Sequence, residues 1–165
     1  METKKNIILF MRNFVFGAED SLVSTVGMLS GIASAGIDRE VIVISGIVLI
    51  FVEAFSMSVG SFLSERVTEE YQNGFNSKTS KSLQAAIIML FSYFISGLIP
   101  LLPYIFLDVT TAFWQSIVAS LVALFGLGYL SARILRTNLL KNALRMMVIG
   151  GTAVFLGVVV GMVVR

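Results

Sequence analysis

The sequence predicts an all-α integral membrane protein with five transmembrane helices. Of the 165 residues, 56% are hydrophobic and only 13% are charged, whereas about a quarter of a soluble domain is charged. The apolar residues gather in runs about as long as the roughly 20 residues that a helix needs to cross a bilayer. The cationic residues gather in short clusters between these runs, as membrane topology requires.

Five apolar runs define the expected helices within a single transmembrane domain, residues 1–165. They cover approximately residues 13–36, 41–64, 82–102, 111–132 and 146–164. The basic start has no small-residue cleavage site, so we expect a short amphipathic lead-in helix rather than a signal peptide. Residues 65–81 are expected to form a short cytoplasmic linker, whose first part can continue the second span as a helix. Pro100 and Pro103 lack a backbone donor and are expected to end or kink the third helix where it leaves the bilayer.

Lysine and arginine are distributed unequally between the two sides of these helices. Only Arg39 and Arg165 lie on the side opposite the N-terminus. The ten others are Lys4, Lys5, Arg12, Arg66, Lys78, Lys81, Arg133, Arg136, Lys141 and Arg145. Because short cytoplasmic loops are enriched in these residues, we expect a cytoplasmic N-terminus and an odd number of spans. This placement also explains why the chain is basic. It indicates a lipid bilayer as the partner and argues against nucleic acid.

The chain contains no cysteine and no histidine. Disulfide bonds, thiolate metal sites and thiol catalysis are therefore excluded, and so is imidazole as a general base or metal ligand. No lysine lies inside a span to activate a serine nucleophile. We expect neither an enzyme nor a permanently bound cofactor, and any metal site must use carboxylate, thioether, hydroxyl and carbonyl groups.

Acidic residues inside the expected spans are the sharpest functional signal. Asp20 lies seven residues after Asn13, roughly 10 Å into the first span. Met57 lies seven residues before Ser64, so antiparallel helices would bring it to the same depth as Asp20. Glu53 lies one turn deeper on the same face as Met57. A charge at this depth needs a partner or a polar cavity. Carboxylates together with a thioether would suit a borderline-soft divalent cation such as Fe²⁺ as that partner.

Each acidic residue also has a structural interpretation. Asp20 could cap or bond backbone groups near the interface, and Glu53 could be protonated and hydrogen-bonded. A second acidic group lies just beyond the second span, where Glu65, Glu69 and Glu70 could form a cytoplasmic entrance for cations. A solvated helix face is the alternative for these three residues.

Small residues recur along the first two spans and in the last one. In membranes they allow helices to approach closely, and hydroxyl groups can bond across the interface. We expect this packing role for Gly17, Ser24, Gly27, Gly60, Pro100 and Pro103. Gly157 and Gly161 form a small-xxx-small step in the last span, which also predicts helix packing.

Four segments, taken in order, resemble the vacuolar iron transporter family. Segment 13–20, with Gly17 three residues before Asp20, resembles the first-span signature of the family. Segment 56–60 has its Ser-Met-x-x-Gly motif, segment 97–104 is similar to its third-span exit, and segment 144–151 is similar to the entry of its last span.

The resemblance implies a five-span homodimer with a path between the subunits. It also implies export of Fe²⁺, and often Mn²⁺, from the cytoplasm in exchange for protons. The transport aspartate of the family corresponds to Asp20 and its methionine to Met57.

The chain departs from the family at several positions. Many members have an acidic residue where this chain has Asn13, and a glycine where it has Ser21. Some relatives have an acidic residue at the position of Leu49, and many bacterial relatives have glutamate at that of Ser61. Residues 65–81 are also too few for the three-helix cytoplasmic domain with which iron-transporting relatives often collect metal.

From these observations we expect a transporter that moves Fe²⁺ or Mn²⁺ out of the cytoplasm by proton exchange. Asp20 and Met57 would be ligands, and Glu53 a ligand or a proton carrier. The alternative is a non-transporting membrane scaffold or regulatory protein that retains the transporter fold. Small size and missing organelle signals favour a prokaryotic cytoplasmic membrane, and a vacuolar-type membrane applies if the chain is eukaryotic.

Overall fold

The computed structural model describes residues 2–73 and 80–164, with side chains described over 7–71 and 80–164. Over these residues the chain forms five α-helices and no strand, which confirms the predicted all-α class. The helices are α1 (Glu2–Ser34), α2 (Arg39–Asn73), α3 (Ser80–Phe106), α4 (Val109–Leu135) and α5 (Leu139–Val164).

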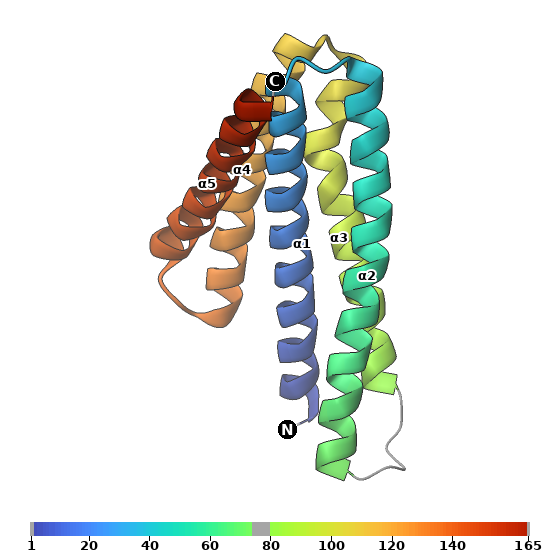
Figure 1. The fold of residues 1–165 in the computed structure, drawn as a ribbon. Helices are drawn as coiled ribbons and strands as arrows, with labels where there is room; N and C mark the ends of the chain where they lie inside the picture. Colours follow the sequence, from blue (N-terminus) through green and yellow to red (C-terminus); the bar gives the residue numbers. More distant parts are fainter. Residues whose placement is uncertain (1, 74–79, 165) are drawn as a thin grey trace.

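Helix α1 lies in the middle of the bundle, with α2 and α3 on one side and α4 and α5 on the other (Figure 1). It contacts each of the other four helices. The two termini lie at opposite ends of the molecule, and the C-terminus lies at the end that carries the α1–α2 and α3–α4 turns (Figure 1). Functional groups on α1 can therefore meet side chains from several helices.

Four helices in the described part of the chain are long and apolar enough to cross a membrane, namely α2, α3, α4 and α5. Helix α1 is not among them, because Glu19, Asp20 and a series of hydroxyl residues lower its hydropathy. Its central position explains why it is more polar, since polar groups within a membrane bundle face other helices rather than lipid.

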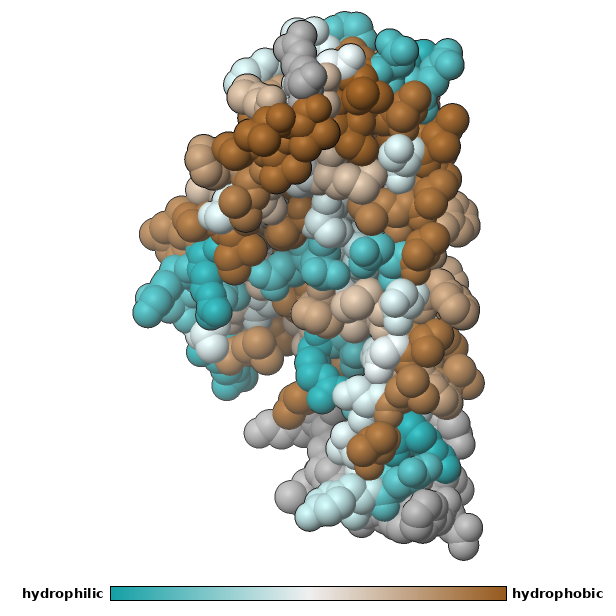
Figure 2. Space-filling view, viewed as in Figure 1, coloured by the Kyte–Doolittle hydropathy of each residue, from teal (hydrophilic) through white to brown (hydrophobic). Residues whose placement is uncertain are grey.

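The outward surface carries large apolar side chains, as expected of a membrane protein. On α2 the side chain of Phe55 is 67% exposed, and on α5 that of Phe155 is 66% exposed. Figure 2 shows broad hydrophobic surfaces above a hydrophilic band that crosses the middle of the view, near the level of the α4–α5 turn. Apolar surface of this extent needs a lipid or protein environment.

The prolines do not end the third helix, which runs through Pro100 and Pro103 to Phe106. Prolines are tolerated inside membrane helices where neighbouring helices supply replacement hydrogen bonds. Here the hydroxyl of Ser116 on α4 donates to the carbonyl oxygen of Pro100 at 2.7 Å. This bond joins α3 to α4 at the buried proline.

Helix α2 extends to Asn73, so the segment from 65 to 73 is helical. The next part of the expected linker, residues 74–79, lies outside the described residues. At the other end of the bundle, Asp108 caps α4 by accepting a hydrogen bond from the Thr111 backbone N–H at 3.0 Å. The hydrogen bonds from Thr111 lower the pKa of the Asp108 carboxyl below its ordinary value.

Helices α1 and α5 cross at very close range through glycines. A Cβ atom added at Gly157 would overlap the carbonyl oxygen of Gly27, and one added at Gly161 would overlap that of Gly31. Gly17 packs α1 against α3, since a Cβ there would overlap the hydroxyl of Ser92. Backbones can approach this closely only where no side chain intervenes.

Candidate functional site

A buried tyrosine joins α1, α2 and α3 near the middle of the bundle. Tyr93 of α3 is fully buried, and its hydroxyl oxygen lies 2.8 Å from the Ser24 hydroxyl oxygen on α1. The same hydroxyl donates to Oε2 of Glu53 on α2 over a longer distance of 3.4 Å. The backbone carbonyl of Tyr93 accepts a hydrogen bond from Ser21 at 2.6 Å. One residue therefore connects polar groups of three helices.

Near this junction, the carboxyl group of Glu53 is bonded to Tyr93 and the carboxyl group of Asp20 lies within electrostatic range of both. They lie close enough to interact electrostatically with each other, and both interact with the Tyr93 hydroxyl. Both carboxylic side chains are partly buried. Two like charges in such a place repel each other unless a proton or a cation lies between them. The pair is therefore suited to binding one or the other.

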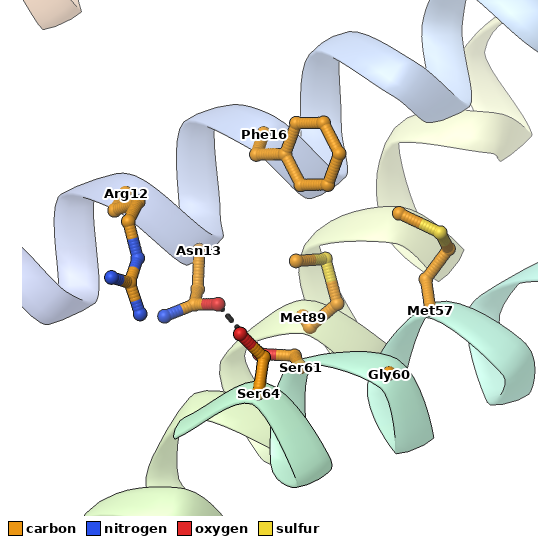
Figure 3. Close-up of a pocket in the computed structure, with 8 residues that line it drawn as sticks. All are labelled: Arg12, Asn13, Phe16, Met57, Gly60, Ser61, Ser64 and Met89. Atoms are coloured by element: carbon orange, nitrogen blue, oxygen red, sulfur yellow. Dashed lines mark hydrogen bonds between the residues drawn. The ribbon is translucent and has the colours of Figure 1, made fainter. Parts of the chain in front are cut away.

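Met57 lines a cavity of about 470 Å³ between the lower part of α1, α2 and the start of α3. Figure 3 shows the side chains of Met57 and Met89 beside this cavity, with Phe16 across from them on α1. The cavity is lined by Arg12, Asn13, Phe16, Met57, Gly60, Ser61, Ser64 and Met89. Its polar groups are hydroxyls, one amide and one guanidinium, and none is a carboxylate.

Asn13 and Ser61 bond to each other within this cavity. The hydroxyl of Ser61 donates to the side-chain oxygen of Asn13 at 2.6 Å (Figure 3), and the Asn13 amide donates to the Leu9 carbonyl at 2.9 Å. This pair is neutral, so neither position adds a charge to the cavity. Among the described residues of this chain, no atom lies within 4 Å of a Cβ added at Gly60, so the chain itself offers no packing partner for this glycine.

Asp20 lines a second, smaller hollow of about 210 Å³. Its other lining residues are Phe16, Glu19, Val23 and Ile149. Phe16 is common to both hollows, and its side chain is 53% exposed. The structure therefore places Asp20 within electrostatic range of Glu53, and it places Asp20 and Met57 in two different hollows rather than in one.

Within the described part of the chain, no group of three or more acidic residues could hold a metal ion. One chain offers two carboxyl groups at the Tyr93 junction and thioether and hydroxyl groups in the cavity beside it. A divalent transition ion usually takes four or more ligands. Water or a second copy of the chain would have to supply the others.

The three glutamates of the expected entrance each have an ion-pair or hydrogen-bond partner within the chain. Glu65 pairs with Arg12 at 2.6 Å, and Glu70 pairs with Arg66 at 2.7 Å. Glu69 accepts a hydrogen bond from Ser82. Glu65 and Glu69 are buried, so their shared face packs against α1 and α3 instead of facing water. This geometry favours a role in joining the helix ends.

Tyr93 and Met89 were not identified from the sequence. Both lie in an apolar run of the third helix, where tyrosine and methionine commonly serve packing alone. Their functional placement depends on which residues of α1 and α2 they meet, and no spacing along the chain reports that. A hydroxyl group in the middle of an apolar span was the one available signal for Tyr93.

The fold and the site define a helical membrane protein with paired carboxyl groups inside its bundle. Comparison with known proteins identifies its family. Residues 11–79 and 65–162 match the model of the VIT family, and the chain belongs to this family.

The curated relatives bear a consistent name. The chain is 28% identical to "Vacuolar iron transporter homolog 4" of Arabidopsis thaliana over 155 residues, which cover 87% of this chain and 78% of that protein. It is 26% identical to "Vacuolar iron transporter homolog 1" of the same plant, with the same coverage. A shorter match, 35% identical over 74 residues, covers 44% of this chain and 29% of "Vacuolar iron transporter 1" of Oryza sativa subsp. japonica.

Proposed function

We propose that this protein transports Fe²⁺, Mn²⁺ or both out of the cytoplasm in exchange for protons. The observation that carries the proposal is the presence of two partly buried carboxyl groups, Asp20 and Glu53, within electrostatic range of each other on neighbouring helices of an apolar bundle, with Glu53 bonded to the buried Tyr93. Acidic groups in such a position are expensive to bury and are typical of ion and proton pathways. Membership of the VIT family and the names of its relatives support iron as the substrate.

The exchange follows from the chemistry of a carboxylate. A metal ion and a proton compete for the same oxygen lone pairs, so metal binding releases protons. Met57 and Met89 border the neighbouring cavity, and their thioethers would favour Fe²⁺ over Mg²⁺ or Ca²⁺. Metal would enter through this cavity, pass Phe16, and reach the carboxyl pair.

We infer that α1 is a fifth spanning helix and that the N-terminus faces the cytoplasm. The N-terminus and C-terminus lie at opposite ends of the bundle (Figure 1). Cationic residues gather at the ends of the helices on the N-terminal side, which supports this orientation. They include Arg12, Arg66, Lys81, Arg133, Lys141 and Arg145.

We also infer a homodimer, in which a second copy completes the coordination of the ion. One chain offers too few carboxyl groups in the described region for a closed site. Both hollows lie against the exposed side chain of Phe16, where a second chain could approach. The names of the relatives support a vacuolar-type membrane if the protein is eukaryotic, and the cytoplasmic membrane is the counterpart in a prokaryote.

A non-transporting scaffold or regulator is the second candidate. It is favoured by the neutral Asn13–Ser61 pair, which takes the place of acidic residues at the cavity, and by the engaged glutamates at the end of α2. The retained Asp20–Glu53 pair opposes it, because two idle carboxyl groups inside the bundle would only destabilise the fold.

Transport by purified protein in liposomes would separate the two candidates. With a metal-quenched dye inside and anaerobic Fe²⁺ or Mn²⁺ outside, we expect quenching faster than in protein-free liposomes. We expect little uptake of Mg²⁺ or Ca²⁺ by the same vesicles. Rates equal to those of protein-free liposomes for both transition ions would contradict transport and favour the scaffold.

A further inference from the structure

We propose that the ion pair of Arg12 and Glu65 controls the entry of metal into the cavity between α1, α2 and α3. Arg12 places a positive charge at this cavity, and Glu65 balances that charge so that cations can enter. The inference rests on the proposed transport of metal through the cavity. It assigns to the pair the metal concentration at which transport reaches half of its maximal rate.

Arg12 is the charged residue among the described residues that line the cavity of about 470 Å³. The others are asparagine, serine, methionine, phenylalanine and glycine, all of them uncharged. The side chain of Arg12 is 60% exposed, so its guanidinium is accessible to ions in the water. In Figure 3, Arg12 and Met57 lie at opposite ends of the group of lining residues. A cation that comes from the N-terminal end of α1 therefore passes Arg12 before it reaches Met57.

Glu65 of α2 fixes the position of this guanidinium. Its carboxylate accepts a hydrogen bond from Nη2 of Arg12 at 2.6 Å, and its own side chain is only 10% exposed. Glu65 does not belong to the residues that line the cavity. It therefore balances the charge of Arg12 without serving as a ligand for an ion inside the cavity.

A second contact between α1 and α2 keeps Arg12 beside the cavity. The next residue of α1, Asn13, is buried and accepts the hydrogen bond from the Ser61 hydroxyl at 2.6 Å. Ser61 and Glu65 are four residues apart and share one face of α2. Two consecutive residues of α1 thus bind two consecutive turns of α2, and the guanidinium has little freedom to move away.

The balance between the two charges decides how readily a cation enters. Clefts lined by one sign of charge change the local concentration and the association rate of ions by about 10- to 1,000-fold. With Glu65 removed, the guanidinium alone would repel metal ions from the cavity. With Arg12 removed, the carboxylate of Glu65 would attract them. The intact pair gives an intermediate affinity, which suits a transporter that exports metal when it accumulates.

Helix α2 supplies a matched control pair one residue further along the chain. Arg66 and Glu70 form an ion pair of 2.7 Å, and their side chains are 24% and 33% exposed. Neither residue lines the cavity. Changes in this pair remove the same charges from the same helix but leave the charges beside the cavity in place.

Initial rates of Mn²⁺ uptake into liposomes would be measured over a range of metal concentrations, at low salt and in about 1 M KCl. At low salt we expect Glu65→Gln to raise the concentration for half-maximal uptake by about tenfold and Arg12→Gln to lower it by at least about threefold. The maximal rates should change little. Both shifts should shrink at high salt, where the screening length falls to about 3 Å. Arg66→Gln and Glu70→Gln should stay close to the wild type.

The double variant, Arg12→Gln with Glu65→Gln, provides a second test of the charge balance. It removes both charges, so its half-maximal concentration should return close to the wild-type value. This variant replaces Glu65→Gln should that protein fail to fold, because a shift in Arg12→Gln that the double variant reverses tests the same balance.

The outcomes separate this inference from the proposed function. Shifts in the same direction in Arg12→Gln and Glu65→Gln would mean that the pair only joins the helix ends, which contradicts the inference. Unchanged values, or shifts that are equally large at high salt, would contradict it as well, and wild-type transport would leave the proposed function intact in each case. Absence of transport in the wild type would contradict the proposed function itself, and this inference with it.

Discussion

Replacing Asp20 by asparagine is expected to reduce metal transport to the level of protein-free vesicles. Asparagine keeps the shape of the side chain but removes its negative charge and its ability to exchange a proton. A divalent ion that leaves water for the apolar bundle would then lose the carboxylate that lies within electrostatic range of Glu53. Because the remaining charge would offset less of the desolvation of a doubly charged ion, uptake should fail. Dye quenching by Fe²⁺ or Mn²⁺ in liposomes measures the loss.

Glu40→Gln is the matched control for this substitution. Glu40 is an exposed carboxylic residue in the first turn of α2, so this variant loses the same charge far from the carboxyl pair. It should transport at the wild-type rate. Full transport by Asp20→Asn, in protein that elutes as the wild type does in detergent, would remove Asp20 from the site.

Replacing Gly157 by alanine is expected to destabilise the protein strongly. The added methyl group would overlap the Gly27 backbone carbonyl, and backbone cannot move aside as a flexible side chain can. Helix α5 would have to shift away from α1, at a cost of about 1–3 kcal/mol for overpacking of this kind. Thermal unfolding in detergent, followed by the loss of helical circular dichroism, measures the change.

Gly151→Ala is the control on the same helix. No atom of the described residues lies within 4 Å of a Cβ added there, so alanine is accommodated and gains roughly 0.5–1 kcal/mol of helix propensity. We expect this variant to unfold at or slightly above the wild-type temperature. Equal unfolding temperatures for the Gly157 and Gly151 variants would mean that the α1–α5 crossing is looser than described.

The fold was largely predictable because a helix that contacts lipid must be built from a long run of apolar residues. Each run corresponds to one helix, and the basic clusters between them lie near the helix ends. The ends of the helices were less predictable. Pro100 and Pro103 suggested a helix end, but the bond from Ser116 to the Pro100 carbonyl supports a continuous α3. Such compensation comes from another helix and leaves no mark in the local sequence.

For the candidate site, the sequence predicted only how deep each residue lies within the helix bundle. Counting residues from the helix ends placed Asp20 at the level of Met57, with Glu53 one turn away. Depth does not fix how each helix is rotated about its axis. In the structure Asp20 lies within electrostatic range of Glu53, while Met57 borders the adjacent cavity with Met89. The rotation is set by glycine contacts and by the hydrogen bonds of Tyr93, which depend on all three helices.

The glutamates of α2 illustrate the same limit. Their position just beyond the apolar run suggested either a solvated face or a cation entrance. Glu65 is instead buried against Arg12, and Glu69 accepts a bond from Ser82 at the start of α3. Both partners belong to other helices, Arg12 at 53 residues from Glu65 and Ser82 at 13 residues from Glu69, so the pattern along α2 alone could not identify them.

Mn²⁺ binding by the purified protein tests the central claim, that Asp20 and Glu53 hold one cation between two helices. Free hydrated Mn²⁺ gives an electron paramagnetic resonance signal that is lost on binding, so affinity can be measured for wild type, Asp20→Asn, Glu53→Gln and the double variant. If both carboxylates hold the same ion, either single change should abolish most of the affinity and the double variant should lose little more. Wild-type affinity in both single variants, or independent losses that simply add, would contradict a shared site.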